Sequence, residues 1–193
     1  MILKNKYFIL RHGKTIYQEE KKGIIYPSLP ENSHVHLTKE GRKQIKKVAK
    51  ELKKEGIDLI FSSDFSRTKE TAEIVAKKLK KGIIFSEKLR DINLGIYHGK
   101  NKKVYYKDFP RGSDKMFFQK PKNGESWLEC QKRMIKFLKE VDKKYEGKKI
   151  LIIGHGDPLW LLMGAVKNWS FKKMLIIKKK GQTIKNGELK KLN

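Results

Sequence analysis

The chain has 193 residues, a length typical of one domain, and its single cysteine, Cys130, excludes an internal disulfide and favours a reducing compartment. The formal net charge is +26, but only six of the 47 basic residues are arginines and the lysines are spread along the whole chain, so the charge disfavours a dedicated nucleic-acid-binding face. The apolar runs near the N-terminus are too short for a signal peptide or a membrane span, and we therefore predict a single-domain cytoplasmic protein over residues 1–193, with no membrane partner.

Apolar strands alternate with amphipathic helices along the chain, which predicts an α/β fold with a mostly parallel sheet. In the first half, Thr38 is a suitable N-cap, apolar residues recur after it at helical spacing, and Gly56 ends the pattern. The elements predicted in this half are a strand at 7–10, a long loop at 14–37, a helix from Thr38 to Gly56, a strand at 59–61, a helix at 67–79 and a strand at 83–85.

The second half begins with a long segment rich in glycine and proline, and irregular segments of this length in a compact domain are usually functional. The elements predicted here are the irregular segment at 86–124, a helix at 125–145, a strand at 150–153, a short helix through Val166, and C-terminal strands at 175–177 and around a tight turn at 186–187. Together with the first half, this order predicts a three-layer α/β/α sandwich.

Two of the predicted strands run directly into a histidine. YFILRHG at 7–13 ends on His12, and ILIIGHG at 150–156 ends on His155. Ligands of open α/β sheets bind beyond the carboxyl ends of the strands, so the two imidazoles are expected to lie a few ångströms apart if the strands are neighbours. A third strand leads through SSDFSR to Arg67 at the start of a helix, and the long segment supplies Asp91.

These side chains suit the transfer of a phosphoryl group. Two arginines can clamp a tetrahedral oxyanion, one neutral imidazole can attack phosphorus, and the other can stabilise charge in the transition state. A carboxylic acid can protonate the leaving oxygen, and Gly13 leaves room beside His12 for a substrate or for a backbone contact that fixes the tautomer. Nothing in this set requires a metal or a cofactor, and the His34 and His36 pair has no third ligand nearby, so we interpret it as part of a polar loop.

Several segments resemble, in order, the motifs of the histidine phosphatase superfamily, whose members have a phosphoglycerate mutase-like fold. The segments are RHGKT at 11–15, LTKEGRKQ at 37–44, SSDFSRTKETA at 62–72, LRDINLGIYHGK at 89–100, NGES at 123–126 and GHG at 154–156. The resemblance covers almost the whole chain. Each segment alone is weak evidence, whereas their common order, with each at its predicted strand end or loop, is strong evidence.

The resemblance implies a metal-independent phosphatase that works through a phosphohistidine. His12 would attack the phosphoryl group and water would then hydrolyse the intermediate, while Arg11, Arg67 and His155 would hold the phosphoryl oxygens. Gln18 falls where members often have an asparagine that contacts the phosphate. The remaining candidates for contacts with phosphate or substrate are Gly13, Thr15 and the backbone amide of Gly156.

The chain departs from the motifs of the family at the proton donor. Members carry a glutamate in the L-x-E position, where this chain has the shorter Asp91. The main rival is Asp157, because a second branch of the superfamily places its acid next to the histidine that corresponds to His155. The other departures are Lys14, Asp64 and His98, and Lys14 makes the mouth of the site more positive.

We therefore expect hydrolysis of a small phosphorylated metabolite. The nearest rival is a phosphoglycerate mutase, but residues 19–31 lack the Phe-Thr-Gly-Trp segment that mutases of this family carry. A phosphohistidine-protein phosphatase would use the same pocket chemistry. The alternative from a different class is a basic nucleic-acid-binding protein with a vestigial site, and the complete set of Arg11, His12, Arg67 and His155 argues against it. The oligomeric state is not readable from the sequence.

Overall fold

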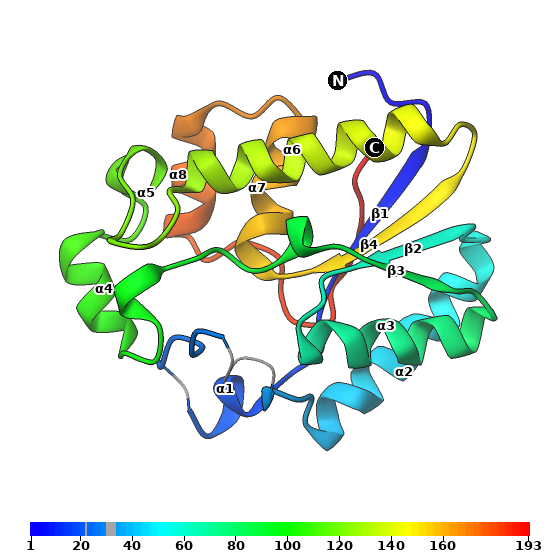
Figure 1. Ribbon diagram of the computed structural model, residues 1–193, viewed down its shortest axis with the longest axis horizontal. Coiled ribbons are helices and arrows are strands. Elements are labelled where there is room, and N and C mark those ends of the chain that lie inside the picture. Colours follow the sequence, from blue (N-terminus) through cyan, green and yellow to red (C-terminus); the bar gives the residue numbers. More distant parts are fainter. Residues whose placement is uncertain (22, 30–33) are drawn as a thin grey trace.

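A computed structural model describes residues 1–21, 23–29 and 34–193 of the chain. Within these residues the strands form one sheet in the order β3-β2-β4-β1-β5, in which β5 runs antiparallel to β1 and the other neighbours are parallel (Figure 1). The strands are β1 (Lys6–Arg11), β2 (Leu59–Ser62), β3 (Ile83–Phe85), β4 (Lys149–Gly154) and β5 (Leu189–Lys191). The predicted α/β fold with a mostly parallel sheet is confirmed.

The helices connect the strands along the chain. They are α1 (Ile16–Glu19), α2 (Lys39–Glu55), α3 (Ser66–Leu79), α4 (Lys102–Asp108), α5 (Lys115–Phe118), α6 (Trp127–Lys144), α7 (Gly156–Val166) and α8 (Phe171–Lys179), with short 3₁₀ turns η2 (Glu87–Leu89) and η3 (Gly95–Tyr97). The prediction of α2 was accurate, because Thr38 accepts a hydrogen bond from the Gly41 amide at its N-terminus and Gly56 adopts a left-handed conformation at its C-terminus.

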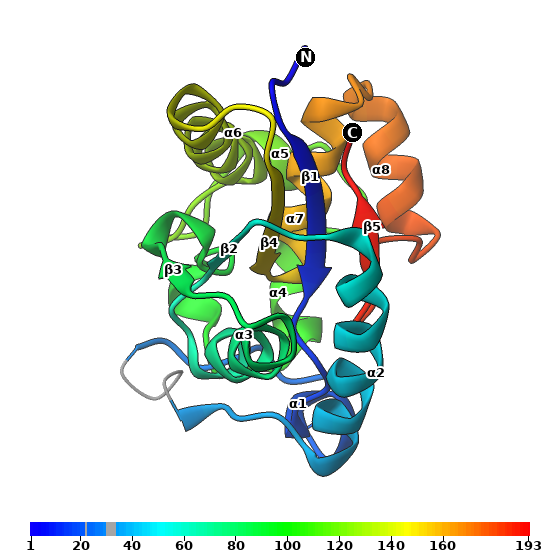
Figure 2. The same cartoon turned by 90° about the vertical axis from the view of Figure 1, so that its right-hand side faces the viewer.

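The central strands are buried on both faces, and this produces the three layers. In β1, Tyr7 and Ile9 face one apolar core, while Phe8 and Leu10 face the other. The first core contains the apolar residues of α6 and α7, and the second contains those of α2 and α3. Figures 1 and 2 show α6 and the α2–α3 pair on opposite sides of the sheet. His12 and His155 directly follow the last residues of β1 and β4, at the carboxyl edge of the sheet between the two cores.

The predicted strand at 175–177 is wrong, because these residues belong to helix α8. The β-branched Ile176 and Ile177 favour a strand locally, but tertiary packing overrides this preference. Ser170 caps the helix by accepting from the Lys173 amide, and Met174 and Lys178, four residues apart, are both buried on one face. The turn at 186–187 is present, but only its second flank forms a strand, β5.

The two long segments that we predicted as irregular contain short helices. Segment 86–124 carries η2, η3, α4 and α5, and α4 is too short to give a clear helical period in the sequence. The loop at 14–37 begins with α1, and its residues 22 and 30–33 lie outside the described residues. Both segments lie at the carboxyl ends of the strands and supply the walls of a cleft.

Gly41 is required where α2 meets the loop that follows His12. A Cβ atom at this position would lie 2.2 Å from the Lys14 carbonyl oxygen and 2.9 Å from its amide nitrogen. We expect Gly41→Ala to lower the free energy of unfolding by about 1–3 kcal/mol, although alanine is the better helix former. Urea denaturation measures this, with Gly82→Ala as the matched control, because a Cβ at Gly82 would meet nothing within 4 Å. Equal stabilities of the two variants would contradict the close approach.

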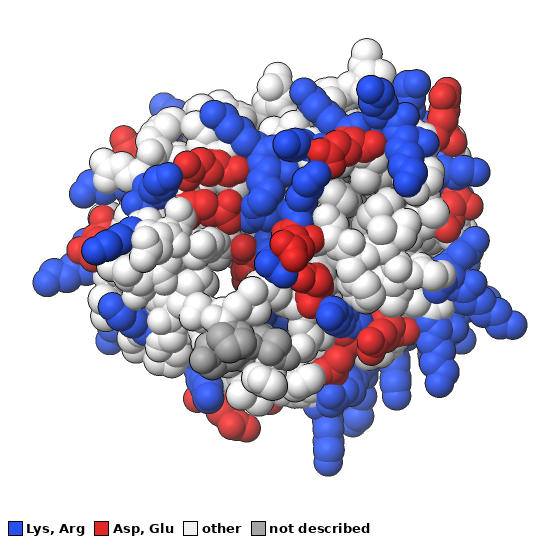
Figure 3. All heavy atoms as spheres, in the orientation of Figure 1, with Lys and Arg blue, Asp and Glu red and all other residues white. Residues whose placement is uncertain are grey.

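Basic residues are spread over the molecule. Figure 3 shows Lys and Arg around the whole outline of one face, with Asp and Glu between them. The surface visible in that view therefore matches the expected solvated distribution of lysines. Among the described residues, no helix is both long enough and apolar enough to cross a bilayer.

Candidate active site

The parallel pairing of β1 and β4 brings the two predicted histidines together. Arg11 lies opposite Gly154 in the register, and the His12 amide donates to the Gly154 carbonyl at 3.1 Å. The ring centroids of His12 and His155 are 5.4 Å apart. The neighbouring strands therefore place both imidazoles at one point on the carboxyl edge of the sheet, as the sequence pattern predicts.

The His12 imidazole is buried, with 1% of its surface exposed, and its Nδ1 lies 2.8 Å from the Gly13 carbonyl oxygen. A carbonyl can only accept, so Nδ1 carries the proton and the lone pair resides on Nε2. Burial lowers the pKa of His12 well below its ordinary value, and the positive charges of Arg67 and Arg11 and the neighbouring His155 lower it further. His12 is therefore a neutral imidazole with a nucleophilic nitrogen.

Gly13 contributes a backbone contact to the His12 imidazole and does not leave free space beside it. A Cβ at Gly13 would lie 2.8 Å from the Gly41 carbonyl oxygen and 2.9 Å from the Ile45 side chain, so helix α2 fills the space beside it. The Asn186 side-chain amide donates to the carbonyls of His12 and Gly13 at 3.3 and 3.5 Å. The C-terminal turn thus supports the backbone at His12 and Gly13, a long-range contact that the sequence did not indicate.

His155 is oriented by Ser63, whose hydroxyl lies 2.9 Å from the imidazole Nε2. The other nitrogen, Nδ1, lies 3.6 Å from the Asp91 carboxylate, and this neighbour favours a proton on Nδ1. We therefore assign Ser63 as the donor to Nε2, which leaves Nδ1–H directed at the site. Ser63 follows strand β2 in the SSD segment, and the sequence analysis quoted it without assigning it a role.

The two predicted arginines lie beside the imidazoles. Arg67 is fully buried, its guanidinium donates to Asp91 at 3.1 Å, and it stacks 4.1 Å from the centre of the Tyr26 ring. Arg11 donates through Nη1 to the Ile184 carbonyl at 2.8 Å. A Cβ at Gly156 would lie 3.0 Å from the Arg11 guanidinium carbon, so the missing side chain lets Arg11 pack on the N-terminus of α7.

Two buried polar atoms at this point have no hydrogen-bond partner among the described residues, namely Arg11 Nε and His155 Nδ1. A buried donor without a partner costs free energy, and a bound ion is one of the arrangements that would satisfy such a group. Helix α7 begins here at Gly156, so its positive dipole end points to the same place. The arrangement can hold an oxyanion.

Asp91 completes the cluster. Its side chain is 21% exposed and pairs with Arg67, so the shorter acid does reach the arginine and the histidine. Arg133 on α6 donates to the carbonyls of Lys88 and Arg90 at 2.7 and 3.1 Å and also pairs with Glu125. These bonds fix the backbone directly before Asp91.

The backbone after Asp91 is held in the same way. The Glu125 carboxylate accepts from the Asn93 amide at 3.0 Å, and the Glu125 amide donates to the Asn93 carbonyl at 2.8 Å. The Arg133–Glu125 pair thus clamps both sides of the Asp91 turn. Glu125 belongs to the NGES segment noted in the sequence, but the sequence could not indicate that its partner is Asn93, 32 residues earlier.

The rival carboxylate, Asp157, lies in the first turn of α7 and forms an ion pair with Lys178 of α8. Lys178 is 7% exposed and lies over the rings of Trp127 and Trp160, at 4.9 and 5.7 Å from their centroids. Asp157 is therefore held by a buried ammonium, whereas Asp91 is held by Arg67 beside the imidazoles.

Thr15 and Gln18 form the capping box of α1. The Gln18 side-chain oxygen accepts from the Thr15 amide at 2.9 Å, and both side chains bond to the Tyr26 hydroxyl. Gln18 lines the cleft, but the Thr15 side chain is buried behind it. Tyr26, which stacks on Arg67, was missed because it lies in a loop without periodicity.

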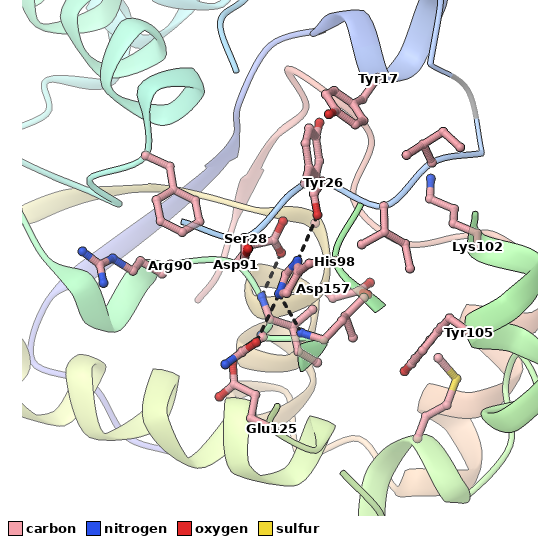
Figure 4. Close-up of a pocket in the computed structure, with 18 of the residues that line it drawn as sticks. Tyr17, Tyr26, Ser28, Arg90, Asp91, His98, Lys102, Tyr105, Glu125 and Asp157 are labelled. Atoms are coloured by element: carbon pink, nitrogen blue, oxygen red, sulfur yellow. Dashed lines mark hydrogen bonds between the residues drawn. The ribbon is translucent and has the colours of Figure 1, made fainter. Parts of the chain in front are cut away.

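A cleft of about 800 Å³ opens above this cluster. Figure 4 shows Arg90 on one side and Lys102 and Tyr105 of α4 on the other, with Asp91 and Asp157 between them in this view. Arg11, Asp91 and Gly156 line the cleft, whereas the two imidazoles lie buried below them. The cleft is large enough for a small metabolite.

The buried neutral histidines predict an acid-sensitive fold. The pKa values of His12 and His155 are both lowered, chiefly by burial, so the unfolded chain binds their protons first as the pH falls. The contribution of the two histidines to the free energy of unfolding is therefore fully present above pH 6.5. Below pH 6.5 it is lost, by up to about 1.4 kcal/mol per pH unit for each histidine.

Urea denaturation between pH 7 and pH 5, without phosphate, measures this loss. His12→Asn should make the loss smaller, whereas His34→Gln should leave it unchanged, because His34 is exposed. A pH dependence that is identical in wild type and His12→Asn would contradict the neutral, buried state of His12.

No group of three histidine, cysteine or acidic side chains that could hold a metal occurs in the described ranges. His36 of the H-x-H pair instead bonds to Glu70 through Nδ1 at 2.5 Å. Cys130 is fully buried, and burial raises the pKa of its thiol well above the ordinary value, so it is not activated.

Comparison with known proteins identifies the family. The model of the histidine phosphatase superfamily (branch 1) matches residues 7–185. "Probable phosphoglycerate mutase GpmB" of Escherichia fergusonii is 28% identical over 166 residues, which cover 82% of this chain and 73% of the relative. These matches are spread over the chain rather than confined to one motif.

Solved structures show the same fold. The mycobacterial glucosyl-3-phosphoglycerate phosphatase with VO3 has a TM-score of 0.80 at 21% identity, covering 95% of this chain and 90% of that one. The phosphoserine phosphatase of Entamoeba histolytica with 3-phosphoglyceric acid has a TM-score of 0.76 at 24% identity, covering 96% and 88%. With the family model matched over nearly the whole length, this chain belongs to the histidine phosphatase superfamily.

Proposed function

We propose that this protein hydrolyses phosphate monoesters of small metabolites through a phosphohistidine on His12. The observation that carries the proposal is the state of His12, a neutral imidazole whose Nε2 lone pair is left available by the bond from Nδ1 to the Gly13 carbonyl. Arg11, Arg67 and His155 lie beside it with donors suited to three phosphoryl oxygens.

In the first step, the His12 Nε2 lone pair forms a bond to phosphorus and the bond to the ester oxygen breaks. Asp91, in its protonated form, donates its proton to the leaving alkoxide. The phosphoryl oxygens would take the place of the Asp91 carboxylate on Arg67, because both need the same guanidinium. Entry of the substrate thus releases Asp91 towards the leaving group.

In the second step, water attacks the phosphohistidine. The Asp91 carboxylate removes a proton from the water as the new P–O bond forms, and the N–P bond breaks to return neutral His12 and free phosphate. The cations at Arg11 and Arg67 stabilise the charge on the phosphoryl group in both steps. One carboxyl group therefore serves as acid and then as base.

Asp91 suits this role better than Asp157. The Asp91 carboxylate lies 3.6 Å from His155 Nδ1 and pairs with Arg67, so it is next to the groups that hold the phosphoryl oxygens. Asp157 is instead engaged by the buried ammonium of Lys178 on α8. The match to branch 1 agrees with this assignment, since the acid beside the second histidine belongs to the other branch.

A mutase activity is the second candidate, because curated relatives carry the name probable phosphoglycerate mutase. Against it, the sequence lacks the Phe-Thr-Gly-Trp segment of the mutases in residues 19–31. A mutase must also protect the phosphohistidine from water, and the cleft that opens above this site admits water. Hydrolysis is the outcome that this site favours.

The proposal is tested by a phosphate-release screen over a panel of phosphorylated metabolites, with His12→Ala as the blank. We expect release that depends on His12 from several small phosphate esters. Isomerisation of 3-phosphoglycerate without phosphate release would identify a mutase instead. Equal release from wild type and blank for every ester would refute a phosphatase that uses His12.

A further inference from the structure

The contact that holds Asp91 at the site is one that the proposed reaction removes. In the structure the Asp91 carboxylate accepts from Arg67 at 3.1 Å and lies 3.6 Å from His155 Nδ1. A bound phosphoryl group needs the same Arg67 guanidinium, so this ion pair breaks when the ester binds. Aspartate has a single methylene between its backbone and its carboxyl group. Once Arg67 has turned to the phosphoryl group, the backbone at Asp91 therefore decides where the carboxylate lies.

Arg90, the residue directly before Asp91, forms a two-point ion pair with Asp64. Its Nε donates to Asp64 Oδ1 at 2.8 Å and to Oδ2 at 3.1 Å, and its Nη2 donates to Oδ2. Figure 4 shows the Arg90 side chain extending away from Asp91. Paired hydrogen bonds of this kind fix both the distance and the orientation of the two groups. The pair thus ties the Asp91 segment to the segment that carries Arg67, three residues after Asp64.

The turn before Asp91 is tied to the end of β2 on both sides. The Ser86 amide, directly before η2, donates to the Ser62 carbonyl at 2.9 Å. The Arg90 side chain, directly after η2, holds Asp64. Because Ser62 and Asp64 are only two residues apart, η2 cannot move away from the end of β2 without breaking one of these contacts.

Charge and packing keep the Asp64–Arg90 pair formed. Burial by itself would raise the pKa of Asp64, but the hydrogen bonds and the charge of Arg90 outweigh it and lower the pKa. The bond to Asp64 in turn raises the pKa of Arg90. The two side chains are 22% and 29% exposed, so solvent screens their attraction only in part. The Phe65 ring lies 5.1 Å from the Arg67 guanidinium carbon and 5.6 Å from that of Arg90, which fixes the spacing of the two arginines.

Asp64 is separated from the substrate. Arg90 and Asp91 line the cleft, whereas Asp64 is not among the described residues that do so. A bound ester therefore does not compete for Asp64, and the pair with Arg90 persists when Arg67 binds the phosphoryl group. Any effect of Asp64 on the reaction must pass through the residues that it holds.

We propose that Asp64 and Arg90 are positioning residues for the proton donor, because their ion pair holds the backbone at Asp91 and so keeps the carboxylate beside the leaving oxygen. The inference rests on the proposed function, since it takes Asp91 as the acid. It deepens that function by adding two residues that act through Asp91 and not on the reacting atoms. The same placement serves Asp91 when it takes a proton from water in the second step.

The test measures the pre-steady-state release of alcohol from an alkyl phosphate and from p-nitrophenyl phosphate. Asp64→Ala and Arg90→Gln should each slow the alkyl ester at least about tenfold, because a carboxyl group displaced by about 1 Å donates its proton poorly. Release from the aryl ester should stay within about threefold of wild type, because its leaving group needs no proton, and this also shows that the variants are folded. Similar losses for both esters would overturn the positioning role.

A double-variant cycle tests whether the effect passes through Asp91. Added to Asp91→Asn, Asp64→Ala should change the ratio of alkyl to aryl rates by less than about twofold, because the acid is already absent. Asp64→Ala and Arg90→Gln combined should lose no more than the larger single loss, since both remove one ion pair. A further loss of the ratio in Asp91→Asn would overturn the proposal. So would a loss in Arg90→Gln that Asp64→Ala does not share, because Arg90 would then act on the substrate itself.

Glu140→Gln is the matched control. Glu140 on α6 forms an ion pair with Lys88 of the same turn, but it is exposed and is not among the described residues of the cleft. The substitution removes an ion pair from η2 and leaves Asp64 and Arg90 in place, so it should not change the ratio of alkyl to aryl rates. A ratio lowered as far as in Asp64→Ala would indicate general loosening of the turn and would overturn the specific role of the pair.

The two proposals can fail separately. Phosphate release that depends on His12, with the wild-type ratio of alkyl to aryl rates in both pair variants, would retain the phosphatase and remove the positioning role. If no ester is hydrolysed, crystal structures of wild type and Asp64→Ala with inorganic phosphate decide the positioning role. A shift of the Asp91 backbone by at least about 1 Å in the variant would retain it, and an unchanged Asp91 would remove it.

Discussion

Replacement of His12 by alanine is expected to reduce phosphate release by at least about 10⁴-fold, the scale of loss seen when a covalent nucleophile is removed. No other side chain of the described site offers a neutral nitrogen with a free lone pair, because the Nε2 of His155 is occupied by Ser63. Initial rates with p-nitrophenyl phosphate and with an alkyl phosphate measure the loss.

The loss should not arise from unfolding. His12 is a buried group that the fold keeps neutral, and its side chain makes one short hydrogen bond, to the adjacent Gly13 carbonyl. Urea denaturation should show a folded His12→Ala protein, with a midpoint lowered only by the cavity that the imidazole leaves. His34→Ala serves as the activity control at an exposed histidine. Turnover of a folded His12→Ala protein within tenfold of wild type would remove His12 as the nucleophile.

Asp91→Asn is expected to slow the hydrolysis of an alkyl phosphate by about 10²–10⁴-fold, the usual contribution of a general acid. Asparagine keeps the size of the side chain and can still accept from Arg67, so the site should keep its shape. The attack step on p-nitrophenyl phosphate should lose much less, because its leaving group needs no proton. Pre-steady-state release of the two alcohols measures this difference.

Asp157→Asn is the matched control. Its carboxylate lines the same cleft but is held by Lys178, so the substitution should not produce a difference between alkyl and aryl esters. Equal losses for both esters in Asp91→Asn, or a larger selective loss in Asp157→Asn, would transfer the proton-donor role to Asp157.

The sequence predicted the parts of the site that follow from strand ends. His12 and His155 could be placed together, because each follows a short apolar run and the carboxyl ends of parallel strands converge at one sheet edge. The position of Arg67 at the start of α3 was predictable for the same reason. These positions follow from short apolar runs in the sequence and from the rule that parallel strands end at the same edge of a sheet.

Contacts between distant segments could not be predicted in this way. The Arg133–Glu125 pair holds the turn around Asp91, and Asn186 contacts the backbone of His12. Both contacts join residues that lie far apart in the sequence, so no local hydrophobic period relates them. Residues 175–177 of helix α8 were predicted as a strand because isoleucines favour one, and the burial of Lys178 that reverses this preference is a tertiary effect. The ion pair of Asp157 depends on that helix, because Lys178 lies on it.

The covalent intermediate provides the most direct test of the mechanism. Asp91→Asn should form it readily from an aryl phosphate and hydrolyse it slowly, because the water loses its base. After brief exposure of this variant to labelled p-nitrophenyl phosphate, an alkaline quench and mapping by mass spectrometry should find an acid-labile phosphoryl group on His12. A phosphoryl group on any other side chain would contradict the account.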